Sequence, residues 1–252
     1  MTAIDFMTSL ASRSVAGARV RPYGVDVADL EIDFDAPRPS VVTRVLAACL
    51  RGADDDMWSL PVQTRILLLL GISELSVATP VEVHLACACG ETAVIELSTA
   101  ELASFAAEHH RDELVVSAGE TSARLRLPTG RDQLRWAQLA SSNDVVRDVI
   151  SDLVVEGDRS APDALWVAAD KLLSDADPLV ELELGSACPA CGTALVRQVD
   201  LERIALTRLR NARRALLEQV HVLASTYHWT EPTIAALPAW RRVEYATVAR
   251  QR

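Results

Sequence analysis

The fold is decided by residues 180–199, Val180-Glu-Leu-Glu-Leu-Gly-Ser-Ala-Cys188-Pro-Ala-Cys191-Gly-Thr-Ala-Leu-Val-Arg-Gln-Val199. Residues 180–184 alternate between apolar and polar, and residues 194–199 form a second short run, so a β-hairpin is predicted around the central Cys-Pro-Ala-Cys-Gly. Two thiolates three positions apart on a tight turn can chelate one ion, and the glycine that follows permits the required backbone conformation. The stretch therefore predicts a zinc knuckle.

A second stretch has the same layout about 100 residues earlier, Val81-Glu-Val-His-Leu-Ala-Cys87-Ala-Cys89-Gly-Glu-Thr-Ala-Val-Ile-Glu-Leu97. The two stretches form an internal repeat of two cysteine-bearing hairpins. One knuckle supplies two ligands, whereas a structural zinc site takes four in a tetrahedron. We therefore expect Cys87, Cys89, Cys188 and Cys191 to share one structural zinc ion per chain.

The first cysteine pair leaves alternatives open, because its spacing is one residue shorter and Ala86 stands where a Cys-x-x-Cys would begin. The alternatives are buried free thiols, a vestigial site and a redox disulfide, the last of which lacks a thioredoxin-like βαβ pattern around the cysteines. His84 is an alternative ligand. Cys49 lies on an apolar helical face and is expected to be a small core residue.

The other patterns predict an α+β fold, a helical protein whose two hairpins form a zinc-ribbon-like unit. A long C-terminal helix, expected over residues 200–227, is followed by short helices, because apolar residues recur there every three or four positions. The expected organisation has three parts: an N-terminal arm and first helix (1–55), a core with the paired cysteine hairpins and intervening helices (56–200), and an Arg-rich C-terminal helical module (201–252).

Charge and hydropathy exclude several classes of protein. The net charge of −10 argues against general nucleic-acid binding, which needs a basic surface. Residues 201–252 nevertheless carry a net charge of +5, which predicts either a solvated basic face on the long helix or a docking surface for an acidic partner. The start lacks the pattern of a signal peptide, and the longest apolar run, residues 66–72, is too short for a membrane span. A cytoplasmic protein with reduced thiols is expected.

No catalytic set can be assembled from the sequence, so an enzyme is not expected. The phosphate-binding, dinucleotide-binding and nucleophile-elbow glycine motifs do not occur in it. His109 and His110 lie in a polar stretch near a predicted helix end and are expected to face solvent. His221 and His228 have no acid or cysteine nearby at a matching spacing and are expected to be packing or surface residues. A metal-dependent hydrolase would need a zinc that carries water, which a closed set of four sulfur ligands excludes.

Several stretches between residues 58 and 248 together resemble one known family. They are Leu60-Pro-Val-Gln-Thr-Arg65-Ile-Leu-Leu-Leu-Leu70, Leu127-Pro-Thr-Gly-Arg131-Asp132, Ala176-Asp-Pro-Leu-Val-Glu-Leu-Glu-Leu184 with the knuckle at 188–192, and His221-Val-Leu-Ala-Ser-Thr-Tyr227-His-Trp229-Thr-Glu231 with Leu237-Pro-Ala-Trp-Arg241-Arg242-Val-Glu-Tyr245. The chain is similar to the T-even-type phage baseplate hub assembly chaperones, whose relatives occur in contractile phage tails and phage-like contractile injection systems. Both hairpins of that family usually contain Cys-Pro-x-Cys, so Ala86 is a departure.

The resemblance implies a non-enzymatic assembly factor or component of a baseplate hub, with the hub, the spike or other tail proteins as partners and with no membrane or nucleic acid among them. A permanent structural baseplate subunit and a zinc-ribbon nucleic-acid-binding module are the alternatives. Aromatic and arginine side chains dominate interface energetics. The expected partner-binding residues are therefore Tyr227, Trp229, Trp240, Arg241 and Arg242, with packing inside the terminal helices as the alternative.

Overall fold

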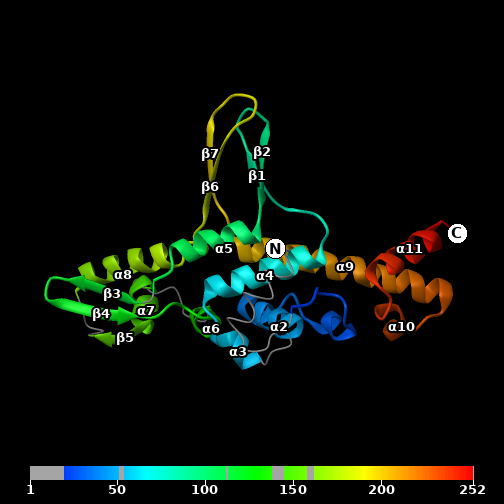
Figure 1. Ribbon diagram of the computed structural model, residues 1–252, viewed down its shortest axis with the longest axis horizontal. Coiled ribbons are helices and arrows are strands. Elements are labelled where there is room, and N and C mark those ends of the chain that lie inside the picture. Colours follow the sequence, from blue (N-terminus) through cyan, green and yellow to red (C-terminus); the bar gives the residue numbers. More distant parts are fainter. Residues whose placement is uncertain (1–19, 51–53, 112, 138–144, 158–161, 252) are drawn as a thin grey trace. The chain divides into compact units, whose positions relative to one another are not determined.

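The computed structural model describes residues 20–50, 54–111, 113–137, 145–157 and 162–251, and these form an α+β protein with about 56% helix and 18% strand. This confirms the predicted fold class, and the long helix α9 (Leu201–Tyr227) is present almost as expected (Figure 1). The described elements before the second hairpin are η1 (Val27–Glu31), α2 (Arg38–Leu50), α3 (Asp54–Ser59), α4 (Val62–Ser76), β1 (Val81–Ala86), β2 (Thr92–Leu97), α5 (Thr99–Glu108), β3 (Leu114–Ala118), β4 (Thr121–Leu125), α6 (Gly130–Trp136), α7 (Val145–Asp152), β5 (Val154–Gly157) and α8 (Asp163–Ala176). After them come β6 (Glu183–Ala187), β7 (Ala194–Gln198), α9, α10 (Glu231–Ala235) and α11 (Ala239–Arg250).

The chain forms two compact units that interleave along the sequence. Unit 1 comprises Met1–Met57, Leu68–Pro80 and Glu202–Arg252, and unit 2 comprises Trp58–Leu67 and Val81–Leu201. The expected division at residues 55 and 200 follows the order of the chain, whereas the contacts group its two ends in one unit. The expected N-terminal arm is described only from Val20, and residues 1–19 lie outside the described residues.

Unit 1 is helical, and many of its buried side chains come from α2, the second half of α4 and α9. The apolar positions expected on one face of α9 are buried or half-buried, with Ala205, Leu209 and Leu223 fully buried. The stretch from Leu68 to Leu70 is likewise buried, as its nearly uninterrupted apolar pattern predicts. Cys49 of α2 is inaccessible to solvent, which confirms its assignment to the core, and burial raises the pKa of its thiol to about 12.

Three arginines of α9 have a structural role within unit 1 that the sequence did not suggest. Arg208 donates hydrogen bonds to the carbonyls of Thr79 and Pro80, at 2.5 and 2.7 Å. Arg213 donates to the carbonyl of Leu30 at 3.0 Å, and Arg210 donates to the carbonyl of Phe34. These side chains fasten connecting segments of unit 1 to the long helix, and Arg210 does so while 55% of its side chain stays exposed.

Unit 2 contains three small antiparallel sheets, with strand orders β1-β2, β3-β4-β5 and β6-β7 among the described residues. Helix α8 packs on the β3-β4-β5 sheet, and its Leu165, Trp166 and Ala169 join the core formed with Leu114 and Leu125. The β1-β2 and β6-β7 hairpins stand side by side, with β1 next to β7 and β2 next to β6 (Figure 1).

Two elements of unit 2 differ from the prediction. Strand β5, at Val154–Gly157, adds a strand beside β4 that the sequence pattern did not indicate. The second hairpin begins at Glu183 rather than Val180, because Leu179 and Leu182 are both buried in a turn. Leu179 and Leu182 are three positions apart, and in a β-strand residues at that spacing point to opposite faces. Both can be buried because this segment is a turn and not a strand.

The described helices do not include one that combines the length and the hydrophobicity needed to cross a bilayer.

Candidate metal centre

The four cysteines of the two hairpins meet in unit 2, at the turns that join their strands. All four Sγ atoms lie within 4.8 Å of one another. The Sγ atoms of Cys87 and Cys191 are 3.6 Å apart, as are those of Cys89 and Cys188. Each close contact therefore joins a cysteine of one hairpin to a cysteine of the other, so a metal ion held here would link the two hairpins.

The shorter first turn still presents both sulfurs, because the two turns close in related ways. The N–H of Gly90 donates to the carbonyl of Cys87 at 3.0 Å, and the N–H of Gly192 donates to that of Cys188 at the same distance. Both glycines have a positive φ, +96° and +72°, with nothing within 4 Å of a Cβ built on them. Glycine is thus required there by backbone conformation and not by space. The first turn has one residue between its cysteines and the second has two, and Ala86 is the last residue of strand β1.

The geometry and the chemistry of the four sulfurs fit a tetrahedral thiolate site. With metal–sulfur bonds of about 2.3 Å, neighbouring sulfurs of a tetrahedron lie about 3.8 Å apart, close to the two distances of 3.6 Å. Hydrogen bonding to the side chain and backbone of Thr193 lowers the pKa of Cys191 to about 6. The backbone of Glu91 and the neighbouring thiols lower the pKa of Cys89. Metals bind the thiolate form, so the shifts of Cys191 and Cys89 favour coordination. The pKa of Cys87 shifts the other way: the backbone of Cys89 lowers it, but the neighbouring thiols outweigh this and raise it to about 12, so a metal would have to displace that proton.

Two residues around the centre were missed by the sequence reasoning. Thr193 Oγ1 lies 3.2 Å from Cys191 Sγ, and the signal for it was a hydroxyl residue directly after the glycine of the knuckle. Arg197 of β7 donates to the carbonyl of His84 in β1 at 3.1 Å and so links the strands of the two hairpins. Nothing in the sequence indicated this contact. The His84 side chain faces Glu82, with Nε2 3.5 Å from its carboxylate. It does not belong to the cysteine cluster found among the described residues.

The first two stretches of the family resemblance, residues 60–70 and 127–132, contact each other inside unit 2. The N–H of Val62 donates to the carbonyl of Pro128 at 2.9 Å, and Pro61 forms an isolated β-bridge with Thr129. Arg65 is fully buried, with its guanidinium 5.4 Å from the centre of the Trp58 ring. A Cβ on Gly130 would lie 2.4 Å from Nη1 of Arg65, so only glycine leaves room for this guanidinium. The two stretches therefore have a packing role.

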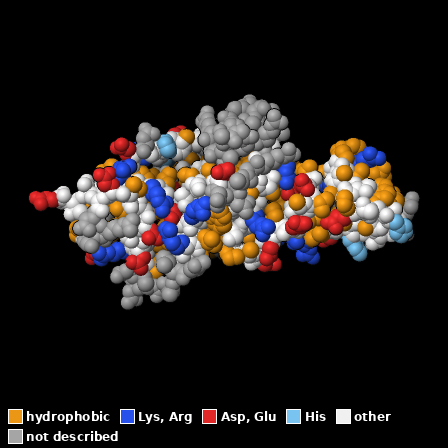
Figure 2. Space-filling view, turned by 90° about the horizontal axis from the view of Figure 1, so that it is seen from below, with side chains coloured by type: hydrophobic (Ala, Val, Ile, Leu, Met, Phe, Trp, Pro, Cys, Tyr) orange, Lys and Arg blue, Asp and Glu red, His pale blue; other side chains and the backbone are white. Residues whose placement is uncertain are grey.

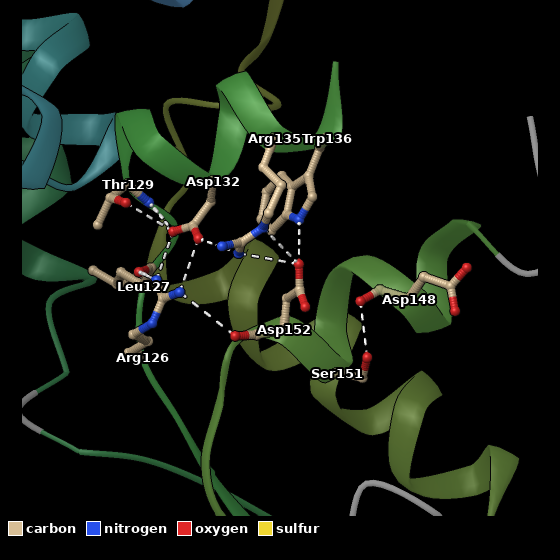
Figure 3. Close-up of polar contacts among 9 residues, drawn as sticks. All are labelled: Arg126, Leu127, Thr129, Asp132, Arg135, Trp136, Asp148, Ser151 and Asp152. Carbon is tan, nitrogen blue, oxygen red and sulfur yellow. Dashed lines mark hydrogen bonds and ion pairs between the residues drawn. The ribbon is translucent and has the colours of Figure 1, made fainter. Parts of the chain in front are cut away.

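Asp132 ties together the segments around α6 (Figure 3). Both terminal nitrogens of Arg126 donate to its carboxylate, at 2.6 and 2.8 Å, and Arg135 donates at 2.7 Å. The backbone N–H and the hydroxyl of Thr129 donate to Asp132 Oδ2 at 2.8 Å each. Burial by itself raises the pKa of Asp132, but these hydrogen bonds outweigh it and hold the pKa at about 2. Its oxygens are occupied by donors, which suits a structural role better than that of a catalytic base.

The residues expected to bind a partner lie in different surroundings within unit 1. Tyr227 and Trp229 stack on each other with ring centres 4.9 Å apart, and Trp229 meets Tyr245 edge-on at 5.2 Å. Arg241 lies over the Tyr245 ring and donates to its hydroxyl at 3.1 Å. Arg242 is buried, whereas 65% of Trp240 is exposed. Trp240 thus has the freest surface of the set.

Comparisons with known proteins identify no relative. Neither the scan against protein-family models nor the searches of curated proteins and of solved structures give a match for this chain.

Proposed function

We propose that this chain is a non-enzymatic, zinc-stabilised assembly factor or component of the baseplate hub of a contractile tail or phage-like contractile injection system. The observation that carries the metal part of the proposal is the set of four sulfurs contributed equally by two hairpins. A tetrahedral set of four thiolates is typical of zinc or of iron, and we propose zinc because structural zinc sites commonly have four cysteine ligands. Four protein ligands leave no position for water or substrate, so the ion would be structural.

The assembly part of the proposal rests on the stretches of sequence that resemble the baseplate hub assembly chaperones. Their roles within the chain are compatible with it, since Arg65 and Gly130 pack in unit 2 and Tyr227, Trp229 and Tyr245 pack in unit 1. The partners would be the hub, the spike or other tail proteins. The chain would work in the cytoplasm, where such particles are assembled.

Deletion of the gene in a cell that produces the particle tests this proposal. Complete particles should be lost on electron micrographs and restored by the wild-type gene. A gene encoding Cys188→Ser should restore them poorly, while Ala190→Ser, which adds the same hydroxyl group between the two cysteines, should restore them fully. Normal particles in the deletion strain would overturn the proposal.

Mass spectrometry of purified particles separates a transient chaperone, which should be missing from them, from a permanent subunit. The alternative of a nucleic-acid-binding module predicts retention on DNA or RNA at low salt, which the net charge of −10 opposes.

A further inference from the structure

A groove with a volume of about 400 Å³ lies in unit 1, where α9 and α11 meet the end of α4 and the segment before η1. Its lining is mostly apolar and includes small side chains from α9, from α11 and from the segment that follows α4. These residues are Ala78, Ala212, Ala215 and Ala239, with Val25, Leu216 and Val243 beside them. Alanines in these positions leave a hollow that apolar side chains of a bound molecule can enter.

The wall of the groove that precedes η1 is held in place. Both oxygens of the buried Asp29 accept hydrogen bonds from Arg21, at 2.6 and 2.7 Å, and Oδ2 also accepts from the N–H of Gly24 at 2.8 Å. The hydroxyl of Tyr23 donates to the Asp29 carbonyl, and its N–H donates to Ser76 Oγ, each at 2.8 Å. The groove is therefore preformed, which lowers the entropic cost of binding.

Arg242 lines the groove and is 93% buried, since its relative exposure is 7%. Its Nε donates to Gln219 Oε1 at 3.0 Å, and Nη1 makes longer contacts to the carbonyls of Ala235 and Leu237. Within the described part of the chain no carboxylate pairs with it, and Nη2 donates to no atom. It is also the only charged side chain among the described lining residues. Burial lowers the pKa of the guanidinium, as expected for a cation without a counter-ion.

A further apolar surface adjoins the groove on α11. Trp240 is 65% exposed and Val243, which also lines the groove, is 49% exposed. Three positions apart, they lie on one face of the helix. Figure 2 shows hydrophobic side chains gathered over the region of α10 and α11. A surface that extends beyond the hollow suits a chain segment better than a small molecule.

We propose that this groove docks an apolar segment of a partner protein, and that one aspartate or glutamate of the segment pairs with Arg242. The partner's large apolar side chain fills the hollow between the alanines, and its neighbours cover Trp240 and Val243. The carboxylate supplies the counter-ion that Arg242 lacks, in a buried setting where a charge-assisted hydrogen bond is strong. The assignment to a partner protein rests on the proposed function, while the apolar and anionic character of the ligand comes from the groove alone.

Selection of a random-peptide display library on the immobilised full-length chain tests the proposal. The selected peptides should carry one Asp or Glu among apolar residues. Replacing that residue by Asn or Gln in the synthetic peptide should weaken binding roughly tenfold, measured by fluorescence anisotropy. Ala215→Trp fills the groove from an exposed helical position and should weaken binding by at least roughly tenfold. Leu217→Trp, on the same helix but outside the groove, should leave it unchanged.

Arg242→Gln should abolish the difference between the acidic peptide and its amide analogue, as a double-mutant cycle would show. The proposal would be overturned if the peptides bound equally well to the wild type and to Ala215→Trp, and if replacing their acidic residue by the amide left the affinity unchanged. A chain that sediments as a dimer and is made monomeric by Ala215→Trp would also overturn it, since the occupant would then be a second copy. If the chain binds the peptides as expected but deletion of its gene leaves the particles intact, only the assembly role would be overturned. Particle assembly that survives Ala215→Trp would overturn only the groove.

Discussion

The Sγ atoms of Cys87 and Cys191 lie 3.6 Å apart, although 104 residues separate the two cysteines in the chain. Cys89 and Cys188 form the second such contact across 99 residues. An ion bound by all four would close a long loop in the unfolded chain and so raise the free energy of unfolding. The stability of unit 2 should therefore depend on the metal.

Cys188→Ser should lower the melting temperature of the protein strongly. Zinc sites of this kind have apparent binding free energies of roughly 10–16 kcal/mol. If the variant loses only about 3 kcal/mol of that, its melting temperature falls by about 6–12 °C, measured by differential scanning calorimetry. Ala190→Ser is the matched control and should melt within a degree or two of the wild type. Equal melting temperatures for both variants would point to a vestigial knuckle.

Gly130→Ala should destabilise the protein by roughly 2–3 kcal/mol, measured by urea unfolding. In an unconstrained helix the same change stabilises, because glycine loses more backbone entropy on folding. Here the new Cβ would lie 2.4 Å from Nη1 of the buried Arg65. Gly185→Ala is the control, since its Cβ would meet nothing nearer than 3.7 Å. A stabilised Gly130→Ala variant would contradict the packing of Arg65 under α6.

Asp132→Asn should cost on the order of 2 kcal/mol, because it removes the charge that strengthens the hydrogen bonds from Arg126 and Arg135 to this buried carboxylate. The pKa of Asp132 is depressed to about 2 in the folded protein and is about 4 in an unfolded chain. Its contribution is therefore fully present above about pH 4 and is lost as the pH falls towards about 2. Asp163→Asn removes a surface carboxylate 3.7 Å from Arg147 and should cost less than about 0.5 kcal/mol. Equal losses in the two variants would refute this role of Asp132.

The free energy of unfolding should fall as the pH rises from about 4 to 7, because of the buried carboxyl group of Asp177. The residue ends α8 and is 4% exposed, and burial raises the pKa of its carboxyl to about 7. Below about pH 4 the group is protonated in both states, whereas at higher pH only the folded state retains the proton, so unfolding becomes easier. Asp177→Asn should remove this pH dependence and gain on the order of 3 kcal/mol at neutral pH.

The control for that variant is Asp175→Asn, an exposed residue two positions away. Its pH profile of chemical unfolding should coincide with that of the wild type. A wild-type profile that is flat between pH 4 and 7 would show that Asp177 is not held in a buried, protonated state.

The sequence predicted the elements that local pattern determines. The seam of α9 and the first hairpin were expected almost at their observed bounds, since heptad-like spacing and alternation carry enough information by themselves. The second hairpin was expected as well, but its first strand begins three residues later than the alternation indicated. The clustering of the four cysteines was also predicted, because each hairpin supplies only two ligands and a structural zinc site needs four.

The rest depended on contacts between distant residues. Strand β5 exists through its pairing with β4, and Arg208 and Arg213 find carbonyls more than 100 residues away. Arg65 appears in the sequence as one cation in an apolar run, yet it is fully buried beside Gly130 and Trp58. No local spacing encodes such partners. The same holds for Arg242, whose isolation in an apolar groove follows from three separate helices.

The most direct test of the account is the metal content of the full-length chain, purified without chelator and measured by inductively coupled plasma mass spectrometry. We predict about one zinc per chain, lost when Cys87 and Cys89 are both replaced by serine as well as when Cys188 and Cys191 are. Protein that is folded but free of metal, or zinc that remains after either double replacement, would contradict a site shared by the two hairpins.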